Sequence, residues 1–160
     1  MKFDRSSLED AGFRGWLSFH EVRASDAIPT TGGVYVVTYA CAPPAAFLSQ
    51  NPGGRFKGRD PSVPATALAA NWIDAEVVYI GKANQLRRRI REYADFGAGK
   101  PIGHWGGRLI WQLARPDLLR IAWRETPGEV PLVVEGAMIT EFRRQHGKPP
   151  FANDPHKLGR

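Results

Sequence analysis

The 160-residue sequence is poor in the residues that build disulfide and metal scaffolds. Its only cysteine, Cys41, excludes an intrachain disulfide and favours a reducing compartment. Its four histidines have no metal-ligand spacing, so a zinc site is not expected. It has no apolar run of about 18 residues, which a membrane-spanning helix needs, and no apolar signal segment near Met1. These absences predict a soluble, cytoplasmic protein that does not enter a membrane.

Acidic residues are the minority among the charges, with 16 Asp and Glu against 22 Lys and Arg and a formal net charge of +6. Such an excess favours a polyanionic partner, although it concerns association and not fold. The length is that of one domain with a sizeable core, and we expect a single domain over residues 1–160. Residues 1–30 are an irregular or partly helical lead-in, and the proline- and glycine-rich residues 41–75 are an insertion.

Three stretches rich in β-branched and aromatic residues predict strands at 34–39, 76–80 and 119–125. Residues 83–94 and 131–145 are predicted helices, the second beginning near Pro131 and ending at Gly147. Shorter helices are expected at 44–49, 64–72 and 108–113. This order of elements predicts a small α/β domain whose strands are not all parallel.

The helix predicted after the second strand is rich in arginine. We expect Lys82, Arg89 and Tyr93 near one of its faces, and Gly81 to form a tight turn before it. Amide groups at a helix N-terminus favour anions, and an arginine can hold a phosphate through two parallel hydrogen bonds. A phosphate-binding surface is one interpretation, and an ordinary solvent-exposed basic helix is the other.

The last predicted helix carries a carboxylate at the end of an apolar stripe, since Glu135, Met138, Ile139 and Phe142 share one face. A buried carboxylate needs a cation, hydrogen bonds or an open cleft. Glu135 is therefore either a ligand for a hard cation such as Mg²⁺ or a peripheral glutamate at the rim of the core.

Further basic and polar residues are candidates for contact with nucleic acid. Arg55, Lys57 and Arg59 lie among glycines in the insertion, where they form either a phosphate-contacting arm or a solvated loop. His104 belongs to a glycine-rich turn, residues 103–108, and has either a structural role or a substrate contact. The expected nucleic-acid contacts are Arg55, Lys57, Arg59, Arg88, His104 and Arg108.

Two short tracts, Gly33-Val34-Tyr35 and Tyr79-Ile80-Gly81, resemble the paired signature of the GIY-YIG endonuclease superfamily. The run from Tyr79 to Tyr93 is most similar to the version in the bacterial nucleotide-excision-repair nuclease, and the resemblance spans residues 30–153. It implies a small α+β domain, with a mostly antiparallel three-stranded sheet flanked by helices. It also implies a metal-dependent endonuclease that hydrolyses phosphodiester bonds in nucleic acid, with DNA as the expected substrate.

The resemblance also implies a role for each matching residue. The implied catalytic residues are Tyr35, Tyr79, Lys82, Arg89, Tyr93, Glu135 and Asn153. Tyr35 would be the general base or hold the attacking water, and Arg89 would stabilise charge on the phosphate. Glu135 would hold one Mg²⁺ or Mn²⁺, Lys82 would support the tyrosines, and Tyr93 and Asn153 would order the site.

The long insertion at 41–75 departs from the family pattern, as does the spacing between Glu135 and Asn153. Two other functions stay open: a non-catalytic nucleic-acid-binding module on the same scaffold, and a protein-interaction domain. Repair, restriction or defence, and mobile-element processing are all compatible with the sequence. It predicts neither the oligomeric state nor whether one strand or two is cut.

Overall fold

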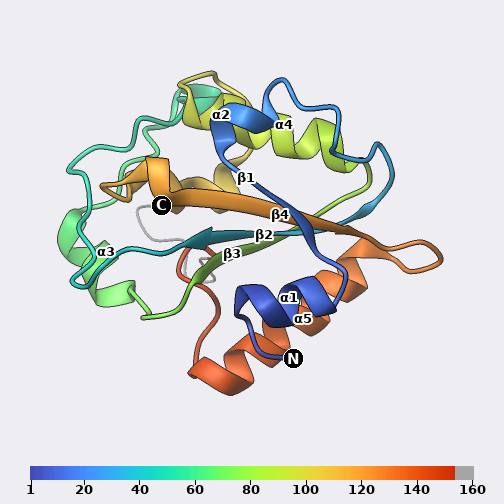
Figure 1. Cartoon of the computed structure of the whole chain (residues 1–160). Helices are drawn as coiled ribbons and strands as arrows, with labels where there is room; N and C mark the ends of the chain where they lie inside the picture. Colours follow the sequence, from blue (N-terminus) through green and yellow to red (C-terminus); the bar gives the residue numbers. More distant parts are fainter. Residues whose placement is uncertain (154–160) are drawn as a thin grey trace.

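At the centre of the computed structural model, which describes residues 1–153, lies a four-stranded antiparallel sheet of order β1-β4-β2-β3 (Figure 1). Its strands are β1 (Arg14–Leu17), β2 (Gly33–Tyr39), β3 (Val77–Ala83) and β4 (Leu119–Glu125). The α-helices are α1 (Arg5–Asp10), α2 (Phe19–Val22), α3 (Ala65–Asn71), α4 (Leu86–Gly97) and α5 (Pro131–His146). Short 3₁₀ segments occur at Phe56–Gly58, Trp105–Gln112 and Pro116–Leu118. The end of the expected domain, residues 154–160, lies outside the described residues.

Helices cover both faces of this sheet, α2 and α4 on one side and α1 and α5 on the other (Figure 1). Alternation along β2 divides its side chains between the two layers. Tyr35 and Val37 pack in the cluster that contains α4, whereas Val34 and Val36 pack with the buried residues of α5. Because β3 is an edge strand, groups from either layer can meet along its open side.

The α+β class and the strands predicted at 34–39, 76–80 and 119–125 are confirmed. The expected number of strands, three, is wrong, because β1 in the lead-in adds a fourth next to β4. This strand is short and irregular: Gly15 has φ 112°, Trp16 has φ 56°, and the register shifts between Gly15 and Leu17. Such a segment lacks the alternation from which strands are predicted.

Two other expectations about local structure are wrong. Strand β3 continues through Ala83, and α4 begins only at Leu86, with the Gln85 side chain accepting a hydrogen bond from Arg88 N–H. Gly81 therefore lies within a strand and not in a turn. Residues 44–49 form no helix; Phe47 instead makes an isolated bridge to Leu113.

The other helix predictions agree better with the structure. The helix predicted at 64–72 is observed as α3, and the segment expected at 108–113 lies in the 3₁₀ helix Trp105–Gln112. The last helix begins at Pro131 and ends where Gly147 adopts φ 83°, as predicted. Within residues 1–153, no helix has both the length and the apolar character that crossing a membrane would require.

Candidate active site

Four aromatic side chains form one buried cluster between the sheet and α4. Tyr35 comes from β2, Tyr79 from β3, Tyr93 from α4, and His104 from the residue before the 3₁₀ helix Trp105–Gln112. The ring centroids of Tyr35 and Tyr79 are 6.0 Å apart, and those of Tyr79 and Tyr93 are 5.4 Å apart. His104 stacks on Tyr93 with centroids 3.7 Å apart, and its Nε2 lies 2.9 Å from the Tyr35 hydroxyl.

The strand register explains how the two signature tyrosines come together. Tyr35 pairs with Gly81 across β2 and β3, and Tyr79 pairs with Val37 two positions further along. Side chains two residues apart on a strand share a face, so both phenols point toward α4. A Cβ at Gly81 would overlap the Tyr35 ring and lie 2.7 Å from its hydroxyl oxygen. The glycine of the second signature tract therefore makes room for the tyrosine of the first.

Of the three phenols, that of Tyr79 is the most accessible and the most easily ionised. Its side chain is 9% exposed, against 1% for Tyr35 and 0% for Tyr93. Burial and, to a smaller extent, the Glu135 charge raise the pKa of Tyr79 to about 12, against the opposing charge of Arg89. Burial holds the pKa of Tyr35 and of Tyr93 well above the ordinary value. The interaction between the two signature phenols lowers the pKa of Tyr79 and raises that of Tyr35.

Arg89 is the cation of this cluster, and its charge acts on the pKa of all four aromatic groups. Its Nη1 donates to the Gly103 carbonyl at 2.8 Å and lies 3.2 Å from a Glu92 carboxylate oxygen. Both of its hydrogen bonds within the described residues use Nη1, which leaves Nε and Nη2 for another acceptor. With its side chain 34% exposed, the guanidinium can present two parallel donors to an incoming phosphate.

Glu135 lies near the start of α5, on the other layer, yet its charge reaches the tyrosines. It raises the pKa of both Tyr79 and Tyr35, which is consistent with the packing of α5 against β3. Burial raises the pKa of Glu135 itself, and Lys82 opposes that shift. Among the described residues its carboxylate accepts no hydrogen bond and forms no ion pair within 4.0 Å. It is thus a partly buried carboxylate with no cationic partner within 4.0 Å among the described residues.

The position of Lys82 differs from the expected one. The predicted helix face that would join it to Arg89 and Tyr93 does not exist, because Lys82 belongs to β3. It pairs with Val34, whose side chain packs in the α5 layer, so Lys82 points away from α4. Its side chain is exposed, and its charge acts on Glu135.

Asn153 binds the backbone of β3 beside Tyr79. Its Oδ1 accepts from Ile80 N–H at 2.8 Å, and its Nδ2 donates to the Ile80 carbonyl at 2.8 Å. The preceding Ala152 N–H donates to the Val78 carbonyl at 2.7 Å. These bonds satisfy the outward-facing groups of an edge strand and fix the peptide that follows Tyr79. Asn153 therefore orders the strand that carries Tyr79.

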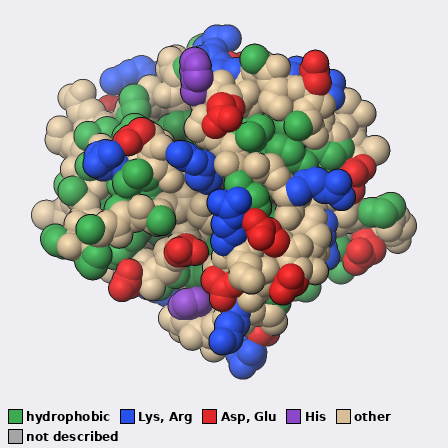
Figure 2. Space-filling view, viewed as in Figure 1, with side chains coloured by type: hydrophobic (Ala, Val, Ile, Leu, Met, Phe, Trp, Pro, Cys, Tyr) green, Lys and Arg blue, Asp and Glu red, His purple; other side chains and the backbone are tan. Residues whose placement is uncertain are grey.

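Of the six residues expected to contact nucleic acid, four are exposed and two are buried. Arg55, Lys57, Arg59 and Arg88 are exposed, whereas His104 is 0% and Arg108 is 1% exposed. Arg59 and Arg108 each lie with Cζ 5.0 Å from the centroid of the Trp105 ring. Full burial leaves the His104 side chain no surface for a direct contact. On the face drawn in Figure 2, basic side chains are interspersed with acidic and apolar ones, so no continuous basic track crosses it.

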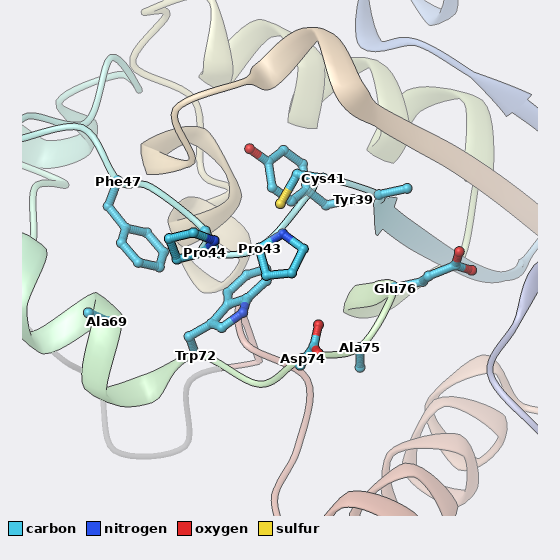
Figure 3. A pocket seen from close by; sticks show the side chains of 12 residues that line it. Tyr39, Cys41, Pro43, Pro44, Phe47, Ala69, Trp72, Asp74, Ala75 and Glu76 are labelled. Carbon is cyan, nitrogen blue, oxygen red and sulfur yellow. The ribbon is translucent and has the colours of Figure 1, made fainter.

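A cavity of about 610 Å³ lies at the other end of β2, away from the aromatic cluster (Figure 3). Its lining includes Tyr39, Cys41, Phe47, Trp72, Asp74 and Glu76. Tyr39 is four residues from Tyr35, about 13 Å along a strand. The walls are apolar and the charged groups are acidic, which is unfavourable for a phosphate. The tyrosine cluster, and not this cavity, carries the groups suited to phosphodiester chemistry.

No family model, no curated protein and no solved structure matches this chain. A function must therefore be argued from the site itself. No three His, Cys, Asp or Glu side chains within residues 1–153 gather into a metal-binding group. A cation held by Glu135 would have one protein carboxylate and complete its coordination with water and phosphate oxygens, as Mg²⁺ commonly does.

The sequence contained little sign of the role that His104 plays in the cluster. Its contact with Tyr35 joins residues separated by 69 positions. The one local signal was the density of glycine around it, at positions 103, 106 and 107. A Cβ at Gly107 would overlap the Tyr93 hydroxyl, so that glycine permits the close approach.

Proposed function

We propose that this protein is a metal-dependent endonuclease of the GIY-YIG type, acting on nucleic acid and more specifically on DNA. One observation carries the proposal: the rings of Tyr35 and Tyr79 lie 6.0 Å apart, and the charges of Arg89 and Glu135, from two other elements of the chain, both act on these two phenols. Hydrolysis of a phosphodiester needs an activated water, positive charge at the phosphoryl oxygens and a cation near the leaving oxygen. These four side chains offer groups for each requirement.

The exposures and pKa shifts suggest how the two tyrosines divide their roles. Tyr79 is the more accessible phenol and has the lower pKa, so we assign it the contact with the attacking water. Tyr35 lies behind it, and in this proposal the Tyr35 hydroxyl donates to the Tyr79 oxygen, which would favour the Tyr79 phenolate and agrees with the lower pKa of Tyr79. This assignment differs from the sequence-based one, which gave the water to Tyr35.

Arg89 supplies the positive charge in this proposal. Its Nε and Nη2 would donate to two oxygens of the scissile phosphate, and its charge favours the ionised form of Tyr79. Nη1 stays bound to the Gly103 carbonyl, so the guanidinium is oriented before substrate arrives. Preorganised donors of this kind are typically worth ~10²–10³ in rate.

Glu135 fits a divalent cation because its carboxylate is partly buried, has a raised pKa and lacks a hydrogen-bond partner among the described residues. Mg²⁺ or Mn²⁺ bound there would stabilise negative charge on the phosphoryl group and the leaving oxygen. Burial raises the pKa of Glu135, and the Lys82 charge opposes that shift and so favours the ionised carboxylate.

The proposal is tested by incubating supercoiled plasmid with the protein in Mg²⁺, in Mn²⁺ and in EDTA, with Tyr79→Phe as a comparison. We expect cleavage by the wild type in either metal and none in EDTA or by Tyr79→Phe. Nicked or linear product reports whether one strand or two is cut. Binding without cleavage would instead identify the non-catalytic nucleic-acid module. Negligible DNA affinity without steep salt dependence would identify a protein-interaction domain.

A further inference from the structure

A single turn, residues 103–107, contacts three side chains of the proposed site. The Gly103 carbonyl accepts from Arg89 Nη1 at 2.8 Å, and the Gly107 carbonyl accepts from the Tyr93 hydroxyl at 2.6 Å. Between them, His104 Nε2 lies 2.9 Å from the Tyr35 hydroxyl. One short segment of chain therefore holds residues from β2 and α4 in a fixed relation.

His104 makes the central contacts of this turn. Its ring is 0% exposed and stacks on Tyr93 with an interplanar angle of 6°. Its Nδ1 is buried without a hydrogen-bond partner among the described residues, whereas Nε2 faces Tyr35. An unpaired buried N–H is rarer than an unpaired acceptor, so the proton is best placed on Nε2. Burial, with a contribution from Arg89, lowers the pKa of His104 and keeps the ring neutral.

We propose that His104 is a positioning residue whose Nε2–H donates to the Tyr35 oxygen and so directs the Tyr35 proton toward Tyr79. With its oxygen occupied by His104, the Tyr35 hydroxyl turns its single hydrogen to the neighbouring phenol. A hydrogen bond from Tyr35 to the Tyr79 oxygen, which faces the attacking water in the function proposed above, favours the phenolate form of Tyr79 over the neutral phenol. The expected effect of His104 on the reaction rate rests on the proposed function, whereas the expected hydrogen bonds of His104 do not.

Two substitutions separate the polar contact from the stacking. His104→Phe keeps an aromatic ring against Tyr93 and removes the nitrogen, whereas His104→Gln retains an amide N–H close to the Nε2 position. We expect His104→Phe to lower kcat about 10²-fold, the typical cost of a small misplacement in an active site, with KM unchanged. His104→Gln is expected to recover most of this loss.

A glycine pair in the same turn provides a second, independent perturbation. A Cβ at Gly107 would overlap the Tyr93 hydroxyl and lie 3.0 Å from His104 Cε1, whereas a Cβ at Gly106 meets nothing within 4 Å. Gly107→Ala is therefore expected to lower kcat by at least tenfold, and Gly106→Ala to leave it unchanged. Thermal melting establishes that each variant is folded before its kinetics are compared.

Nitrogen-15 NMR of the wild-type imidazole tests the hydrogen bonds without any substrate. We expect the His104 ring to carry its proton on Nε2 and to show no titration through neutral pH. In proton spectra we expect a slowly exchanging Tyr35 hydroxyl signal in the wild type, and its loss in His104→Phe. A proton on Nδ1, a histidine that titrates normally, or a folded His104→Phe with wild-type kcat would each overturn the inference. A chain that cuts no nucleic acid but shows the expected spectrum would refute the proposed function alone.

Discussion

Replacing Arg89 by alanine removes a cation that acts on every aromatic group of the proposed site. The side chain is 34% exposed and its hydrogen bonds go to the Gly103 carbonyl and Glu92. Water can replace the guanidinium at both acceptors, so we expect the free energy of unfolding to fall by only about 1 kcal/mol. Loss of a preorganised charge donor is expected to lower kcat by ~10²–10³, or about 2.7–4 kcal/mol in the barrier.

Three further arginine variants make this prediction specific. Arg89→Lys retains a charge but not the two parallel donors, so most of the loss should persist. Arg144→Ala removes one positive charge from an exposed pair with Glu141 on α5 and controls for net charge. Arg88→Ala, at a side chain 74% exposed, should raise KM and reduce the salt slope of binding by about 1.

The assay is cleavage of a labelled duplex in Mg²⁺ under saturating and subsaturating conditions, which separates kcat from KM. Circular dichroism and thermal melting show whether Arg89→Ala is folded. A folded Arg89→Ala that cleaves as fast as the wild type would refute the assignment of Arg89 to the scissile phosphate.

Three other outcomes follow from the geometry. Gly81→Ala should displace the Tyr35 ring by roughly an ångström and lower kcat about 10²-fold. Gly136→Ala, where a Cβ meets nothing within 4 Å, should leave kcat unchanged. Equal rates of steady-state cleavage by Gly81→Ala and the wild type would contradict the role given to Gly81. Alkaline unfolding should be steep, because the raised pKa of Tyr79, from 10.0 to about 12, gives stability that is complete below pH 10 and is lost as the pH rises to about 12. That loss amounts to about 2–3 kcal/mol, and urea titrations of wild type and Tyr79→Phe should show a shallower pH dependence in the variant. Asn153→Ala should leave both outward-facing groups of Ile80 without their partner and speed amide exchange at Ile80; unchanged protection in hydrogen-exchange NMR would show that Asn153 does not fix this strand.

Regular periodicity is what made part of the fold predictable. Helix α4 buries Leu86, Ile90 and Tyr93, the stripe that its spacing predicts. Helix α5 begins at Pro131, which suits the first turn of a helix, and ends at Gly147, which adopts a positive φ, so both ends follow from the residue type at that position. Strand β1 escaped prediction because its conformation depends on a close approach between Gly15 and the Trp123 side chain, which no local pattern records.

In the candidate site, too, some features follow from residues close in sequence, and others depend on contacts between distant parts of the chain. Arg89 and Tyr93 are four residues apart on α4, so their common side follows from helix geometry. The role of Gly81 does not, because it depends on the register that sets β3 opposite Tyr35. The glycine-rich turn leaves both a structural role and a substrate contact open for His104, and only tertiary structure shows that it is buried against Tyr35 and Tyr93.

Single-turnover cleavage of a duplex in saturating Mg²⁺, by the wild type, Glu135→Gln and Glu141→Gln, tests the central claim most directly. Glu141 lies on the same helix, 32% exposed and paired with Arg144, so it controls for loss of an α5 carboxylate. The proposed site predicts cleavage by the wild type and Glu141→Gln, and none by Glu135→Gln. Cleavage by Glu135→Gln at the wild-type rate, or no cleavage by the wild type in any divalent metal, would contradict it.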